Sequence, residues 1–231
     1  MSDDTYRGAS EYDKTVYGTW DLSLEEIKKR ASGKSIGIAQ AAQAAILILQ
    51  ICAFYHHSNI TRDIFQSAAE ESRKHCKVAE KLPQAVTLLD YTLLAVDNDG
   101  QWDDFIFGQG MGVLLSFSLI REQSCKEFSV HPLMHCWSRE QMSKSDQERM
   151  CQIGSIILSC AIPETFTSQD YRLRQLLFPH IKANKLYEGQ IGIIKEYHDD
   201  KYRKFGLVMD ENGDWNNAEQ LQVQVMDMRK K

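Results

Sequence analysis

The sequence lacks a segment that could cross a membrane or direct export. Its most apolar stretch, AAILILQICAF, is too short to span a bilayer. The N-terminus MSDDTYRGASEYDK is acidic and polar, without the positively charged start and apolar core of a signal peptide. We therefore expect no membrane partner and a cytoplasmic location.

Positive charge is also scarce. The 27 Lys and Arg residues are outnumbered by 32 Asp and Glu residues, which gives a formal net charge of -5. A protein that binds nucleic acid usually presents a basic face to the phosphate backbone. The composition therefore predicts no nucleic-acid partner.

The common catalytic motifs are missing. The sequence contains no H-E-x-x-H, no G-x-S-x-G and no glycine-rich dinucleotide loop. Gly33, Lys34 and Ser35 match the end of a phosphate-binding loop, but Lys28 stands where that motif requires glycine, and a helical segment precedes it. A polar turn after a helix is the favoured interpretation. We expect no catalytic residue, no metal and no cofactor bound by this chain alone, and no enzyme activity.

The cysteines do not form a paired motif. Six are present, none in a C-x-x-C arrangement, and several lie within apolar helical stretches. A thiol in such a place behaves as a small hydrophobic group, which fits a reducing compartment.

The first half of the sequence favours helices. Ser23 predicts an N-cap for a helix over Leu24–Ala31, followed by a long helix over residues 38–57 whose C-terminal half is apolar nearly all round. Thr61 predicts the cap of a third helix. The run 103–117 indicates a fourth, although its three glycines weaken it.

A β-hairpin is predicted next. SLIRE and EFSVH, joined by QSCK, are short alternating or β-branched runs. Pro132 suits the first position of a new helix and favours an extended His131 at the end of the second strand. A metal shared by His131 and His135 would require both to be helical, so a strand-end histidine with a local hydrogen bond is the simpler interpretation. His56 and His57 have two interpretations, a helix C-terminal cap or a metal ligand.

The second half reads as helical throughout. Ser145 and Glu148 predict a capping box for a helix that Pro163 ends, and a further amphipathic helix covers residues 168–184. Residues 201–231 predict two helices around an ENGDW turn. Gly206 and Ala218 resemble the small residues that bring the two helices of a tetratricopeptide repeat together. Tyr202, Phe205 and Met209 share one face, which either binds a protein ligand or forms core.

The sequence thus predicts a mostly α fold with four parts. We expect a polar lead-in over 1–19, a winged-helix domain over 20–142 with an insert near 81–102, a helical connector over 143–196 and one tetratricopeptide-like hairpin over 197–231.

Four segments together resemble a known family. DKTVYGTWDLSLEEIKK, LLSFSLIRE, FSVHPLMHCWSREQM and LLFPHIKAN, in this order, are similar to the C-terminal half of fungal NB-ARC proteins of the STAND class, NLR-like signalling ATPases in which a winged helix leads into tetratricopeptide repeats. The similarity runs from Tyr12 onward.

The resemblance implies a role for one histidine. In the family, the winged helix closes over a nucleotide bound by an upstream P-loop domain, and the histidine of a Met-His-Asp motif contacts the β-phosphate of ADP. That histidine corresponds to His131, with Val130 and Pro132 in place of the methionine and aspartate. The P-loop and the magnesium-binding segment are absent from this sequence. The resemblance therefore implies a regulatory part of a longer protein, with ADP or ATP as its nucleotide, an upstream nucleotide-binding domain, a protein or peptide ligand on the repeats, and oligomerisation in the full-length form.

Two alternatives come from other classes. The chain could act as a helical protein-interaction module without nucleotide dependence, or as a DNA-binding winged helix. The acidic start of the segment WDDFIFGQG argues against the latter.

Overall fold

The computed structural model describes residues 11–76, 93–124, 127–163, 170–191 and 199–230. It is mostly helical with one small antiparallel sheet, which confirms the predicted mostly α fold class. The elements are α1 (Glu11–Ala31), α2 (Ile36–Cys52), β1 (Ile60–Thr61), α3 (Arg62–Cys76), α5 (Phe105–Ser116), β2 (Arg121–Ser124), β3 (Glu127–Ser129), α6 (Pro132–Glu140), α7 (Lys144–Cys160), α8 (Tyr171–Ile191), α9 (Asp199–Glu211) and α10 (Trp215–Arg229).

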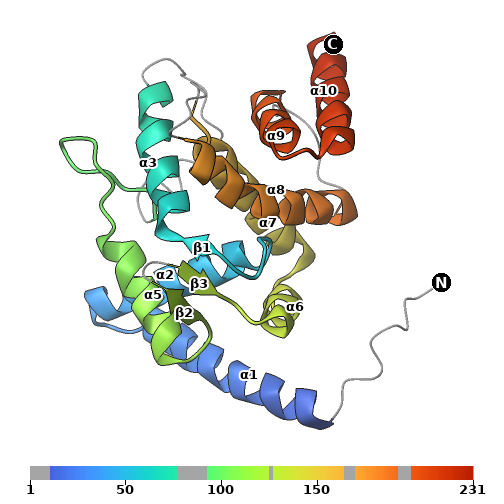
Figure 1. Ribbon diagram of the computed structural model, residues 1–231. Coiled ribbons are helices and arrows are strands. Elements are labelled where there is room, and N and C mark those ends of the chain that lie inside the picture. The colour runs from blue at the N-terminus through green and yellow to red at the C-terminus, as the bar shows by residue number, and fades with distance from the viewer. Residues whose placement is uncertain (1–10, 77–92, 125–126, 164–169, 192–198, 231) are drawn as a thin grey trace.

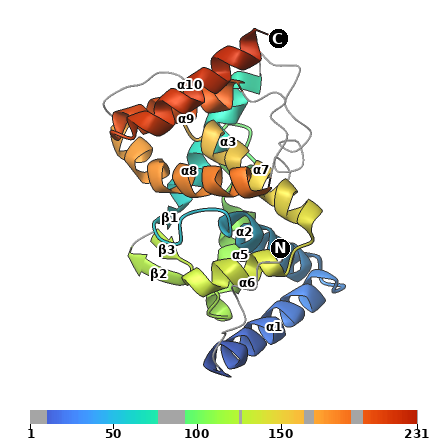
Figure 2. The ribbon, with the colours of Figure 1, turned by 90° about the vertical axis from the view of Figure 1, so that its right-hand side faces the viewer.

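Helix α1 and the α9–α10 hairpin lie at opposite ends of the molecule, with the sheet, α7 and α8 between them (Figures 1 and 2). One continuous cluster of buried apolar side chains nevertheless runs from Leu24 to Val225. No helix in the described ranges combines the length and hydropathy that a bilayer crossing requires.

The predicted start of the first helix is wrong. The helix begins at Glu11, so the expected lead-in is helical over 11–19, while residues 1–10 lie outside the described part. Ser23 does not cap it; its hydroxyl donates to the carbonyl of Thr19 at 2.9 Å inside the helix. A serine can bond to the carbonyl four residues back in mid-helix, so its type alone does not mark a start.

Helices α2 and α5 pack closely because Gly110 has no side chain. A Cβ at this position would lie 2.9 Å from the Cβ of Ala44 and 3.0 Å from the backbone nitrogen of Ala45. Gly108 and Gly112 face open space. The helix predicted over 103–117 is confirmed, starting at Phe105.

The sheet has one strand more than the sequence predicted. The hairpin of β2 and β3 is confirmed, and β1 pairs with the other edge of β3, so that the strand order is β1-β3-β2. The long helix predicted to reach His57 instead ends at Cys52, which frees the chain to turn into β1. Thr61 belongs to this strand, and its buried hydroxyl has no hydrogen-bond partner among the described residues, so its predicted cap is wrong.

The N-cap of α7 lies two residues before the predicted one. Ser143, not Ser145, is the N-cap: its hydroxyl oxygen accepts the N–H of Asp146 at 3.1 Å, and its O–H donates to that carboxylate at 2.7 Å. With this start, the amide of Gln147 donates to the carbonyl of Arg139 at 2.9 Å, a C-terminal carbonyl of α6. The earlier start therefore provides hydrogen-bond partners for the N-terminus of α7 and for the C-terminus of α6.

The C-terminal hairpin follows the prediction. Helices α9 and α10 are joined by a turn in which Gly213 has φ +76°, and a Cβ on Gly206 would lie 3.7 Å from the carbonyl oxygen of Ala218. The two small residues thus allow the close approach expected of them.

Ion pairs tie this hairpin to α8. The guanidinium of Arg174 binds both carboxylate oxygens of Glu211 at 2.5 and 2.7 Å. At the other end of α8, the buried Glu188 accepts from Lys201 at 2.7 Å.

The predicted insert is partly outside the described part. Residues 81–92 are not described, and Val96 and Trp102 form an isolated bridge closing a turn that Asp97 caps. The predicted domain boundaries remain predictions.

Candidate functional site

Three chain segments meet at the end of β3 because of the sheet topology. Strand β3 leads directly into Val130 and His131, β2 starts beside it with Arg121 paired to Ser129, and β1 is preceded by His57, whose carbonyl accepts the N–H of Val130 at 2.8 Å. Because β1 and β2 both run antiparallel to β3, the residues at their N-terminal ends lie beside the C-terminal end of β3.

His131 occupies the position that the sequence predicted. Its backbone is extended (φ -60°, ψ 137°), Pro132 starts α6, and the ring is exposed. The Nδ1 atom accepts the N–H of Leu133 at 3.2 Å, so this ring caps the helix. An accepting Nδ1 carries no proton, which places the proton of the neutral ring on Nε2. The cap thus fixes a donor at the far side of the ring.

A cavity of about 460 Å³ surrounds this ring. Its cationic or ionisable lining groups are Arg121, His57 and His131, and three serine hydroxyls accompany them. No described residue of the lining carries a carboxylate. The lining residues are Trp20, His57, Ser58, Ser118, Leu119, Ile120, Arg121, Gln123, Ser129, Val130, His131, Pro132, Leu133 and Met134. Hydroxyl, imidazole and guanidinium groups without a competing carboxylate suit an anion.

Backbone strain is concentrated at the same cavity. Among the described residues, Asn59 and Ser118 are the non-glycine positions with positive φ, at 59° and 55°. Ser118 lines the cavity and Asn59 follows its lining residue Ser58. Left-handed backbone outside glycine costs free energy and tends to persist at functional sites. The strain therefore favours this cavity as the functional one.

Helix α1 supplies the aromatic edge of the cavity. The ring of Trp20 lies 6.4 Å from that of His131 and 5.8 Å from that of Trp137, centroid to centroid. The indole N–H of Trp137 donates to Asp21 at 2.9 Å, which holds α1 against α6. Trp20 borders the cavity without closing over His131, which remains exposed.

The electrostatics favour a neutral His57. Partial burial, then the neighbouring His56 and His131, lower the pKa of His57. A bound anion would raise the pKa of His57, since it stabilises the protonated ring.

The other predicted histidine candidates are not brought to this cavity. His135 is buried one turn into α6, and its Nε2 has no partner among the described residues. His56 lies beyond the end of α2 and its Nδ1 is 3.1 Å from the hydroxyl of Ser58, so it does not cap that helix. No group of three or more potential metal ligands occurs in the described ranges.

The remaining sequence candidates have structural roles. Gly33, Lys34 and Ser35 form the polar turn between α1 and α2. Tyr202 and Phe205 are 3% and 0% exposed, so of the two alternatives for their face the core applies. Met209 is also buried, at the floor of a second cavity. Burial raises the pKa of the Cys52 and Cys151 thiols to about 12, in keeping with their prediction as small hydrophobic groups.

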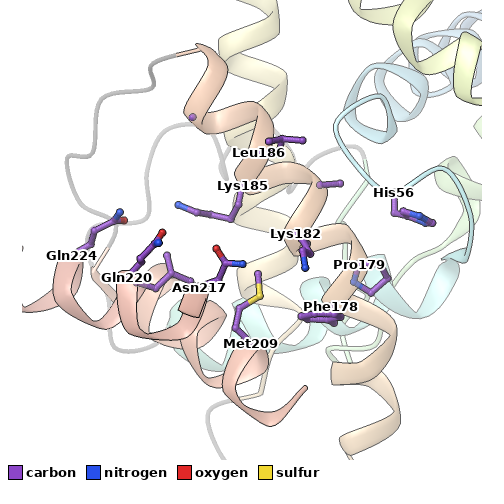
Figure 3. Close-up of a pocket in the computed structure, with 13 residues that line it drawn as sticks. His56, Phe178, Pro179, Lys182, Lys185, Leu186, Met209, Asn217, Gln220 and Gln224 are labelled. Atoms are coloured by element: carbon purple, nitrogen blue, oxygen red, sulfur yellow. The ribbon is translucent and has the colours of Figure 1, made fainter. Parts of the chain in front are cut away.

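The second cavity is a groove of about 710 Å³ between α8 and the α9–α10 hairpin (Figure 3). His56 borders it, whereas the next residue, His57, borders the His131 cavity. The loop 56–59 therefore separates the two cavities.

Sequence reasoning missed most of the residues that line the cavity together with His131. Arg121 and Ser118 belong to the predicted hairpin, but their convergence with His57 depends on β1. The sequence did not predict this strand, because it predicted a helix through residue 57.

The comparisons leave the family open: no family model, no curated protein and no solved structure matches this chain.

Proposed function

We propose that this chain is the regulatory part of an NB-ARC type signalling ATPase, in which a winged-helix lid senses the phosphates of a nucleotide held by an upstream domain. The observation that carries the proposal is the exposed His131 at the end of β3. Its ring caps α6 and lines a cavity without carboxylates among the described residues. In this role the chain is a sensor and not an enzyme by itself, and ADP or ATP belongs to the full-length protein.

The order of elements supports a winged helix. Helix α2, strand β1, helices α3 and α5 and the hairpin β2–β3 follow one another, and β3 lies between β1 and β2. This order is the one that we expect of a winged helix whose wing is the hairpin. The small residues at the α9–α10 contact likewise support a tetratricopeptide-like hairpin that carries the protein-binding function.

The energetics suit a switch. A hydrogen bond to a charged group contributes about 1.5–3 kcal/mol, so one imidazole N–H on a phosphate shifts a closed-open balance by about 10- to 150-fold. In this chain Nδ1 of His131 accepts the N–H of Leu133, which leaves Nε2 as the donor. Arg121, at the start of the neighbouring strand β2, lines the same cavity. Two such contacts of the lid alone correspond to roughly millimolar affinity for a phosphate group.

The two cavities give this proposal a route of communication. The loop 56–59 borders both, and the buried His180 of α8 donates through Nε2 to the carbonyl of Asn59 at 2.9 Å. A shift of this loop on phosphate binding would act directly on α8, which bears the C-terminal hairpin through ion pairs. In the full-length protein, closure over ADP would hold the assembly inactive, and a ligand on the repeats would favour exchange and oligomerisation.

The test measures phosphate binding by the chain itself. Histidine side-chain NMR signals are followed while pyrophosphate or ADP is added to about 20 mM, a range set by the expected millimolar affinity. We expect the signals of His131 and His57 to move together. His131→Asn is the informative variant because asparagine is a good N-cap but cannot reach as far as the imidazole. It should weaken binding at least about 10-fold with little loss of stability.

Two controls fix the interpretation. Sodium chloride at matched ionic strength separates a phosphate contact from general screening, and Lys144→Ala removes an exposed cation on the first turn of α7, away from the cavity. Equal pyrophosphate affinity in the wild type and His131→Asn would remove His131 from the mechanism.

A second candidate is a protein-interaction module without nucleotide dependence. The groove between α8 and α10 favours it, because that groove exists without any nucleotide domain. The DNA-binding alternative gains no support. The sequence of α5, FIFGQGMGVLLS, contains no Lys or Arg, and Asp104 just before it pairs with Arg62.

A further inference from the structure

The groove between α8 and the C-terminal hairpin has the dimensions of a short peptide. Its volume of about 710 Å³ falls in the usual range of ligand sites. On α10 it extends from Asn217 to Gln224, and the seven helical steps between these residues span about 10 Å, since each step rises about 1.5 Å. About three residues of extended chain fit that length.

The floor of the groove is apolar. Phe178, Pro179 and Leu186 of α8 line it together with Met209 of α9 and Leu221 of α10. Leu186 is 60% exposed at the edge of this apolar lining. An apolar side chain of a ligand would cover it and remove it from water.

The charge around this floor is positive. Lys182 and Lys185 line the groove, and no described lining residue is acidic, although the whole chain has a formal charge of -5. Their counter-ions lie outside the lining: Lys182 binds Asp214 at 2.9 Å, and Lys185 lies 3.4 Å from Glu188, which is buried. An ammonium group has three N–H donors, so the half-exposed Lys182 can hold a second carboxylate while it keeps Asp214.

Amide side chains line the opposite wall. Figure 3 shows Asn217, Gln220 and Gln224 of α10 across the groove from Lys182 and Lys185. The Oε1 atom of Gln224 is buried and has no hydrogen-bond partner in the described part of the chain. A buried acceptor without a partner is unfavourable.

We propose that this groove binds a short acidic segment of a partner protein, with one apolar side chain on the Leu186 floor, carboxylates at Lys182 and Lys185, and backbone bonded by the amides of α10. The inference rests on the protein-binding half of the proposed function and is independent of the phosphate cavity. Charge complementarity selects an acidic segment over a basic or a purely apolar one.

The test uses fluorescence anisotropy on the chain without nucleotide. The probe is a fluorescein-labelled hexapeptide with a central leucine flanked by aspartates. Two further probes replace the aspartates by lysine or the leucine by serine. We expect the acidic, leucine-containing peptide to bind at least about 10-fold more tightly than either, which is the size of one charge-assisted bond or one buried side chain.

Three variants locate the site. Lys182→Gln should weaken binding about 10-fold and reduce its dependence on salt, whereas Lys144→Gln, at an exposed lysine outside the groove, should not change it. Leu186→Ser should also weaken binding, and its high exposure makes a loss of folding an unsuitable explanation.

The outcomes are separable. Three results would overturn the groove proposal: equal affinity for all three peptides, unchanged affinity in Lys182→Gln and Leu186→Ser, or no binding at about 1 mM peptide. Self-association of the chain that Leu186→Ser abolishes, measured by sedimentation, overturns it in favour of a second copy as the occupant. Pyrophosphate binding at His131 would be unaffected in either case, so the two proposals fail separately.

Discussion

Replacing Gly110 and Gly112 by alanine should have opposite effects on stability, although both glycines lie in α5 two residues apart. Alanine is favoured over glycine in a helix interior by about 1 kcal/mol, which applies to both positions. At Gly112 nothing lies within 4 Å of the added Cβ, so the gain remains. At Gly110 the Cβ would lie 2.9 Å from the Cβ of Ala44 and 3.0 Å from its backbone carbon, so α2 and α5 must separate.

The contact decides the sign at Gly110. Overpacking of a well-packed contact costs about 1–3 kcal/mol, and the upper part of this range applies because the opposing atoms include backbone that cannot rotate away. After the helix-propensity gain, Gly110→Ala should destabilise the protein by about 2 kcal/mol, and Gly112→Ala should stabilise it by about 1 kcal/mol. For a chain of this size the melting temperatures should move by about -6 °C and +3 °C.

Thermal and urea denaturation followed by circular dichroism measure both variants against the wild type. Gly108→Ala is a second control, since its position is equally open. If Gly110→Ala were as stable as Gly112→Ala, the close approach of α2 and α5 would be wrong, and with it the placement of the sheet that α5 leads into.

Two further predictions concern buried polar groups. Burial lowers the pKa of His135 to about 3 and that of His180 to about 4, below the ordinary 6.5. Below pH 6.5 the unfolded chain therefore binds more protons than the folded chain. The free energy of unfolding should fall toward pH 4 by up to about 1.4 kcal/mol per pH unit for each ring. Urea denaturation between pH 7.5 and 5 should show this slope, and His180→Gln, which keeps a donor for Asn59, should reduce it; a stability independent of pH would contradict the burial. Asp21→Ala should destabilise the protein by about 1–3 kcal/mol, because it leaves the buried N–H of Trp137 unpaired. Glu25→Ala, at an exposed position of the same helix, should change the stability by no more than about 0.5 kcal/mol. Thermal denaturation measures both changes.

Local signals located most helices and one of the strand pairs. Pro132 set both the start of α6 and the extended backbone of His131, because its ring fixes φ and restricts the preceding residue. The alternation in residues 118–131 gave the hairpin. Gly206 and Ala218 marked the contact of α9 and α10, since a Cβ at Gly206 would lie against α10, 3.7 Å from the carbonyl oxygen of Ala218.

Helix ends and the site partners were less accessible. Serines at 23, 143 and 145 are chemically equivalent as caps, and only the packing of neighbouring helices selected Ser143. The apolar run through residue 57 predicts a continued helix as well as a buried turn into a strand, since periodicity does not distinguish them. The strand β1 was therefore missed, and with it the approach of His57 to His131.

The sequence by itself determined that this chain is mostly helical, that a hairpin precedes α6 and that His131 ends its second strand in extended form. These features depend on contacts between residues a few positions apart, whose geometry the residue types nearly fix. Only the tertiary structure decided that His57, Arg121 and His131 share a cavity without carboxylates, and that two lysines and three amides face each other between α8 and α10. Such juxtapositions depend on strand order and helix packing across long stretches of chain, which residue type alone does not specify.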